Sequence, residues 1–166
     1  MYIPFEQMPG HARVWVYQSV KPLAEAAPAA LAESLEQFAG SWESHGIPLR
    51  ASFRVLHDHF IVLAVDETAK DASGCSIDKS VHFMQGLGQR FGLNLFDRSQ
   101  QAFLMDGGVK FVEVKNLKAQ VQAGAIGPET PTFNTLVATV GQLQTEWLLP
   151  AAKSWLARYF RHVPQA

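Results

Sequence analysis

The residues best suited to chemistry lie between positions 73 and 80, where a buried-looking strand pattern gives way to an amphipathic helix pattern. This stretch contains Cys75, the single cysteine of the chain. Backbone N–H groups at a helix N-terminus can bind an anion or stabilise a thiolate. Cys75 is therefore a candidate nucleophile. The candidate anion ligands are Ser73, Gly74, Ser76, Asp78 and Ser80.

A thiol nucleophile needs a general base within hydrogen-bond reach, and histidine is a common one. His11 precedes the first predicted strand, whereas Cys75 follows a strand that runs in the opposite direction. The two residues are therefore expected at the same end of the sheet. His57 and His59 belong to a turn at the other end. Cys75 with His11 is accordingly the candidate catalytic pair.

The same residues also have a structural interpretation. Ser73 or Ser76 can cap the helix, and Asp78 can complement the helix dipole in the first turn. Cys75 can fill a small buried space. Capping is commoner than catalysis at helix N-termini, so we favour the structural interpretation and keep the catalytic one as the alternative.

Two further polar groups have similar pairs of interpretations. His57-Asp58-His59 suggests a metal site, but no third ligand is visible and turns commonly hold polar residues. Asp66 and Glu67 suggest an acid/base pair, but adjacent strand residues point to opposite faces. We therefore predict a solvated turn and two unrelated carboxylates.

Aromatic residues are concentrated near the end of the chain. Trp147, Trp155, Tyr159 and Phe160 can form a peptide-binding groove or belong to the core. The spacing of a helix that starts at Pro150 directs Trp155, Leu156 and Phe160 inward, which favours the core.

The order of the elements indicates the fold class. Strands are predicted at 13–18, 49–56, 60–65 and 102–105, with helices starting near 28 and 77. The order strand, helix, strand, strand, helix, strand is typical of the ferredoxin-like split βαβ fold, with strand order 4-1-3-2. We therefore expect an α+β protein with a ferredoxin-like core over 1–100. Residues 101–166 are expected to form a hairpin and helical extension, packed with the core as one unit.

Both faces of the predicted sheet are apolar. Trp15 and Tyr17 point away from the face that carries Val14 and Val16, and helices cover only one face in this fold. We expect the extension, from 132 to 160, to cover Trp15 and Tyr17, with a dimer partner as the alternative.

Bulk composition limits the function classes. Apolar residues make up 48% of the chain and the formal net charge is −1, which predicts a folded protein that binds neither nucleic acid nor membranes. A single cysteine cannot form an internal disulfide, so a reducing cytoplasm is the expected location. The first residues carry no signal-peptide pattern. No cofactor is expected. An unknown protein or a second copy of the chain is the expected partner.

Several short motifs carry a resemblance across most of the chain. The chain resembles a family of short proteins from Bacteroidetes-type bacteria that are labelled "ABC transporter ATPase" and lack Walker motifs. Residues 124–147 are also faintly similar to GYF-like modules, which implies peptide binding or an accessory role. The motifs shared with the first family include Met1-Tyr2-Ile3-Pro4-Phe5, Val14-Trp15-Val16-Tyr17-Gln18, Val65-Asp66-Glu67, Ser73-Gly74-Cys75-Ser76-Ile77-Asp78, Phe133-Asn134, Trp147 and Ser154-Trp155.

The ATPase label does not agree with the residues. A P-loop requires GxxxxGK[ST], and no Gly-Lys pair occurs in the chain. At the nearest approach, Ser73 and Asp78 stand where both glycines are needed. The sequence therefore predicts a small non-enzymatic interaction or accessory module. The alternative is a thiol-dependent or anion-binding enzyme that uses the turn from 73 to 80.

Overall fold

The computed structural model describes residues 1–161, which form two compact units of mixed α and β structure. Unit 1 comprises Met1–Asp97 and Leu136–Gln144, and unit 2 comprises Arg98–Thr135 together with the chain from Thr145 onward. The α+β class is thus confirmed. No helix within 1–161 is both long enough and apolar enough to cross a bilayer.

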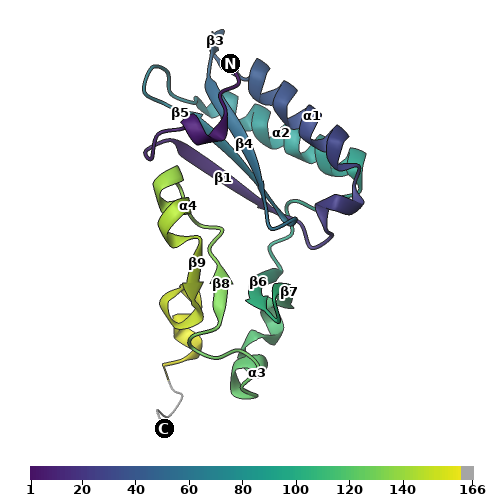
Figure 1. Cartoon of the computed structure of the whole chain (residues 1–166), viewed down its shortest axis with the longest axis vertical. Helices are drawn as coiled ribbons and strands as arrows, with labels where there is room; N and C mark the ends of the chain where they lie inside the picture. The colour runs from purple at the N-terminus through teal and green to yellow at the C-terminus, as the bar shows by residue number, and fades with distance from the viewer. Residues whose placement is uncertain (162–166) are drawn as a thin grey trace. The chain divides into compact units, whose positions relative to one another are not determined.

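Unit 1 is built on a three-stranded antiparallel sheet, whose order is β1-β5-β4 (Figure 1). The strands are β1 (Arg13–Gln18), β4 (Arg50–Leu56) and β5 (Phe60–Asp66). Side chains 60 to 65 of β5 are completely buried, as expected for a central strand with apolar residues on both faces. The prediction of a central strand at 60–65 is confirmed.

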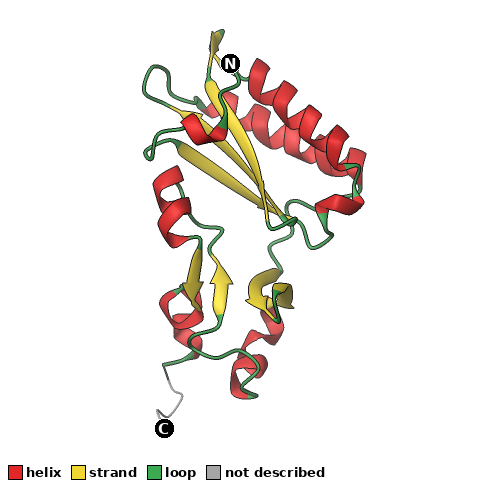
Figure 2. Ribbon diagram, in the orientation of Figure 1, coloured by secondary structure: helices red, strands yellow, loops and turns green. Residues whose placement is uncertain are grey.

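Two antiparallel helices cover one face of this sheet (Figures 1 and 2). Helix α1 (Pro28–Ser41) has proline in its first turn, where the missing N–H costs nothing. Helix α2 (Gly74–Phe91) ends at Gly92, whose φ of 66° suits a residue without a β-carbon. Phe38 and Phe83 join the helices by stacking, with ring centroids 4.2 Å apart.

The expectation for Trp15 and Tyr17 was wrong, because both residues face the helix layer. The Trp15 ring lies 5.6 Å from that of Trp42 at the end of α1, and Tyr17 packs on Phe96 at 5.5 Å. Alternation along a strand separates two sets of side chains, but it does not reveal which set meets the helices. The set that includes Val14 therefore forms the opposite face.

The predicted fourth strand of a ferredoxin-like sheet is not in the sheet of unit 1. Residues 136–144 instead run beside the outer edge of β1. There the Val14 N–H donates to the Ala138 carbonyl at 2.9 Å, and the Val140 N–H donates to Ala12 O at 2.9 Å. Through these two hydrogen bonds, residues 136–144 pair with the edge of β1 where the strand at 102–105 was predicted to lie.

The strand that the sequence predicts at 102–105 belongs to unit 2. The four-stranded sheet of this unit has the order β7-β6-β8-β9. The two-residue turn Asp106-Gly107 joins β6 to β7, and both residues have the positive φ that a type I′ hairpin turn requires. The elements of unit 2 are β6 (Gln100–Met105), β7 (Gly108–Glu113), η3 (Val114–Asn116), α3 (Leu117–Gln122), β8 (Pro131–Phe133), β9 (Leu148–Pro150), η4 (Ala151–Lys153) and η5 (Trp155–Tyr159).

The remaining elements are short. They are η1 (Phe5–Gln7), η2 (Leu23–Glu25), β2 (Glu43–Ser44), β3 (Ile47–Pro48) and α4 (Val140–Glu146). Thr139 caps α4 by accepting a hydrogen bond from the Gln142 N–H at 3.1 Å, as its sequence pattern predicts.

The predicted last helix is instead a pair of 3₁₀ turns, η4 and η5. Leu156 is buried as expected, whereas Trp155 is 38% exposed. A 3₁₀ helix has three residues per turn, so its inward positions differ from those of an α-helix. The inward orientation predicted for Trp155 was therefore wrong.

Two glycines of α2 provide a matched test of packing in unit 1. A β-carbon at Gly88 would lie 2.6 Å from the Leu93 carbonyl oxygen, whereas one at Gly86 would meet nothing within 4 Å. Gly88→Ala should lower the free energy of unfolding by about 1–3 kcal/mol through overpacking. Gly86→Ala should raise it by up to about 1 kcal/mol through helix propensity. Urea denaturation of both variants checks this, and equal effects would contradict the described close approach.

Candidate functional site

The three serine hydroxyls of the turn from 73 to 80 all form hydrogen bonds within it. The Ser73 hydroxyl accepts a hydrogen bond from the Ser76 N–H at 3.2 Å, and Ser73 is the N-cap of α2. The Ser76 hydroxyl donates to the Ser73 carbonyl at 2.8 Å. The Ser80 hydroxyl donates to Ile77 O at 2.6 Å. The interpretation of Ser73 as a helix cap is confirmed.

The other candidate anion ligands fall into two groups. Ser76 and Ser80 are buried, with 1% and 0% exposure, and the Trp42 indole donates to the Ser76 carbonyl at 2.8 Å. Gly74 and Asp78 are exposed. Asp78 lies beyond the first turn of α2, which contains no acidic residue, so its predicted place beside the helix dipole was wrong.

Cys75 is the second residue of α2 and is exposed. The favoured structural interpretation was therefore wrong for Cys75, which does not fill a buried space because its position on the first turn faces outward. His11 contacts other groups: its Nε2 lies 2.9 Å from the Thr68 hydroxyl and 3.6 Å from an Asp66 carboxylate oxygen. Within residues 1–161, no hydrogen bond or ion pair joins His11 to Cys75.

Asp66 is the centre of a polar cluster at the end of β5, together with His11, Arg50 and Thr68. Its carboxylate accepts hydrogen bonds from the Thr68 N–H at 3.0 Å, from the Thr68 hydroxyl, and from Arg50 Nε at 3.3 Å. The Thr68 hydroxyl contributes most to lowering the pKa of Asp66, with further contributions from the Thr68 N–H and Arg50. The cluster therefore holds a largely buried carboxylate in its ionised form.

The sequence contained a signal for part of this cluster that our interpretation missed. Arg50 lies directly opposite Asp66 in the pairing of β4 with β5. The hairpin through His57, Asp58 and His59 sets that register, so cross-strand pairing would have predicted the ion pair. The contact between His11 and Thr68 joins residues 57 positions apart and has no such local signal.

Glu67 serves different partners from its neighbour Asp66. One oxygen lies 3.8 Å from Arg13 Nη1, and the other accepts a hydrogen bond from the Ala72 N–H at 3.1 Å. Glu67 thus braces the loop that leads into α2. The two adjacent carboxylates do not share a binding partner.

The His57-Asp58-His59 turn anchors the segment that follows β1. The Asp58 carboxylate accepts a hydrogen bond from the Ala24 N–H at 2.8 Å, and His59 Nδ1 lies 2.8 Å from the Ser19 carbonyl oxygen. Burial, followed by the nearby His59, lowers the pKa of His57. No group of three or more His, Cys, Asp or Glu side chains suited to a metal occurs within residues 1–161.

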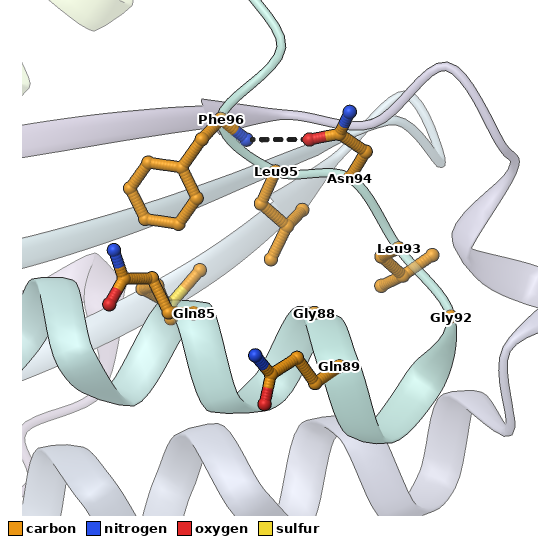
Figure 3. Close-up of a pocket in the computed structure, with 9 residues that line it drawn as sticks. Gln85, Gly88, Gln89, Gly92, Leu93, Asn94, Leu95 and Phe96 are labelled. Carbon is orange, nitrogen blue, oxygen red and sulfur yellow. Dashed lines mark hydrogen bonds between the residues drawn. The ribbon is translucent and has the colours of Figure 1, made fainter.

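Two surface hollows of unit 1 lie on α2, away from its first turn. The larger, about 690 Å³, lies between the second half of α2 and residues 92–96 (Figure 3). Gln85, Gln89 and Asn94 supply its polar groups, beside the exposed ring of Phe96. The smaller, about 440 Å³, lies between α1 and α2. Neither hollow is lined by any residue from 73 to 80.

Among residues 1–161, this end of the sheet brings charged side chains together around Asp66, and none of them is bonded to the Cys75 thiol. Cys75 offers an accessible thiol, the Ser73 cap uses the Ser76 N–H, and His11 is hydrogen-bonded within the Asp66 cluster. No protein family, curated protein or solved structure matches the chain.

Asp66 should contribute measurably to stability. Asp66→Ala removes hydrogen bonds to the carboxylate and should lower the free energy of unfolding near neutral pH by about 1–3 kcal/mol. Because the folded pKa is depressed, this contribution is present above the unfolded value of about 3.9 and is lost as the pH falls through the folded pKa. Urea denaturation across this range measures it. Asp71→Ala, an exposed carboxylate in the same loop, is the control and should have little effect.

Proposed function

We propose that the chain is a non-enzymatic interaction or accessory module. The observation that carries this proposal is the capped turn at the start of α2, where the Ser73 hydroxyl accepts from the Ser76 N–H and the Trp42 indole donates to the carbonyl of the buried Ser76. An anion-binding or acyl-transfer site needs its N–H groups free to meet a ligand. Here the Ser76 N–H donates to the Ser73 hydroxyl instead, so this hydrogen bond supports a structural role for the turn as the cap of α2.

Large apolar side chains at the surface support a binding role. Phe96 is 40% exposed, Trp155 is 38% exposed and Leu136 is 74% exposed. Single exposed apolar residues are common on soluble proteins, but aromatic residues are also the usual anchors of protein interfaces. A protein partner or self-association is the expected form of that binding. We place the module in the cytoplasm, which the exposed, unpaired thiol of Cys75 supports.

We further infer that unit 1 is related to the ferredoxin-like split βαβ arrangement. Its strand order, β1-β5-β4 with α1 and α2 on one face, supports this relation for three of the four strands. The chain's resemblance to the short proteins labelled "ABC transporter ATPase" is part of the same proposal. Nucleotide hydrolysis is not, since no P-loop sequence is present.

The alternative enzyme requires Cys75 to act with His11, and chemical labelling separates the two functions. We expect iodoacetamide to label Cys75 in the folded protein, because the thiol is exposed. His11→Ala should leave the labelling rate unchanged between about pH 6 and pH 9, since His11 contacts Thr68 and Asp66 instead.

Cys75→Ser gives the background, and labelling followed by mass spectrometry gives the rate. A rate that falls several-fold when His11 is replaced would make the thiol-dependent enzyme the better proposal. His82→Ala, which removes an exposed histidine from α2, is the matched control.

A further inference from the structure

The 3₁₀ turn η5 of unit 2, with the residues that flank it, presents a cationic aromatic surface that we call the Arg158 patch. It consists of Lys153, Trp155, Arg158, Tyr159 and Arg161. In a 3₁₀ helix, residues i and i+3 lie one above the other, so Trp155 and Arg158 share a face. The side chains of Lys153, Trp155, Arg158 and Arg161 are exposed, while Leu156 of η5 is buried in the core of unit 2.

The aromatic side chains hold Arg158 in place. Its guanidinium carbon lies 5.2 Å from the centre of the Trp155 ring and 4.9 Å from that of Tyr159. One of its N–H groups donates to the Tyr159 hydroxyl at 3.0 Å. Stacking of this kind lowers the entropy that an arginine loses on binding a ligand.

Trp155 is itself anchored to the sheet of unit 2. Its indole N–H donates to the Gln101 side-chain oxygen at 3.0 Å, and the Gln101 amide donates to the Thr132 hydroxyl at 2.7 Å. The Thr132 hydroxyl in turn donates to the buried Ala102 carbonyl at 2.8 Å. The exposed ring is therefore a preorganised surface rather than a loose side chain.

The charge of the patch is uncompensated in the described part of the chain. No acidic residue occurs from 147 to 161, and none of Lys153, Arg158 and Arg161 forms an ion pair within residues 1–161. The whole chain carries a formal net charge of −1, so this positive charge is local. A patch of this sign favours a partner that carries carboxylates.

We infer that the Arg158 patch binds an acidic peptide segment of a partner protein. A carboxylate of the peptide would accept hydrogen bonds from the free N–H groups of Arg158, whose planar fork matches carboxylate geometry. An apolar side chain of the same peptide would pack on the exposed edge of Trp155. Tryptophan, tyrosine and arginine are the residue types that most often dominate interface energetics. This inference rests on the proposed interaction function and assigns it a surface and a partner class.

Fluorescence anisotropy with the full chain tests the inference. The probe is a short labelled peptide of alternating glutamate and leucine, and the comparison peptide replaces glutamate with glutamine. The acidic peptide should bind more tightly, and added salt should weaken its binding. Arg158→Ala should weaken binding by about tenfold, and Arg158→Lys by severalfold, because an ammonium group cannot reproduce the bidentate fork.

Lys115→Ala is the matched control, since it removes one exposed positive charge of unit 2 that pairs with Glu113. It should leave the affinity unchanged, and circular dichroism should show that all variants are folded. Equal binding of the glutamine peptide, equal effects of Arg158→Ala and Lys115→Ala, or no binding of the acidic peptide would each overturn the inference. Tighter binding of a single-stranded DNA oligonucleotide would overturn it as well.

Failure of this inference can be told apart from failure of the proposed function. If the acidic peptide does not bind while Cys75 labelling is independent of His11, only the assignment of the Arg158 patch is lost. If labelling depends on His11, the non-enzymatic character of the proposed function is overturned, and the peptide result alone then decides whether the Arg158 patch is a binding surface.

Discussion

The complete burial of β5 is the constraint on which unit 1 depends. Six successive side chains, from Phe60 to Val65, are removed from solvent, so neither face of the sheet can be left open. Helices α1 and α2 cover one face. Beside the outer edge of β1, the chain returns as residues 136–144, with Val137 and Val140 buried. A segment distant in sequence therefore occupies the edge of β1 that a fourth strand would otherwise take.

The same constraint explains why the polar residues at the end of β5 serve structure. The chain must pass from a fully buried strand to an exposed loop, and Asp66 lies at that transition. Its carboxylate is stabilised by Thr68 and Arg50, and Glu67 then braces the loop through the Ala72 N–H. Ser73 begins α2 with its own cap. Asp66, Glu67 and Ser73 thus satisfy backbone groups and charges at a strand-to-helix transition, whereas the Cys75 thiol stays exposed.

Unit 2 obtains its exposed aromatic surface from a different local geometry. An α-helix over the same residues would have placed Trp155 with Leu156 on the buried side. The 3₁₀ turn instead buries Leu156 and leaves Trp155 beside Arg158. The difference in exposure follows from the number of residues per turn, since the side chains themselves are unchanged.

The sequence by itself determined the features that local backbone chemistry controls. These include the start of α1 at Pro28, the end of α2 at Gly92, the turn at Asp106-Gly107 and the cap at Ser73. Each depends on residues within one or two turns of the chain, where steric limits on φ and short hydrogen bonds decide the outcome.

Only the tertiary structure decided which elements pair and which faces meet. It placed strand 100–105 in the sheet of unit 2, turned Trp15 toward the helices, and joined His11 to Thr68 instead of Cys75. These outcomes depend on competition between distant segments for the same strand edge or polar group. Alternation and spacing predict which side chains share a face of a strand or helix. The packing of the whole unit decides which other element that face contacts and which polar group a donor meets.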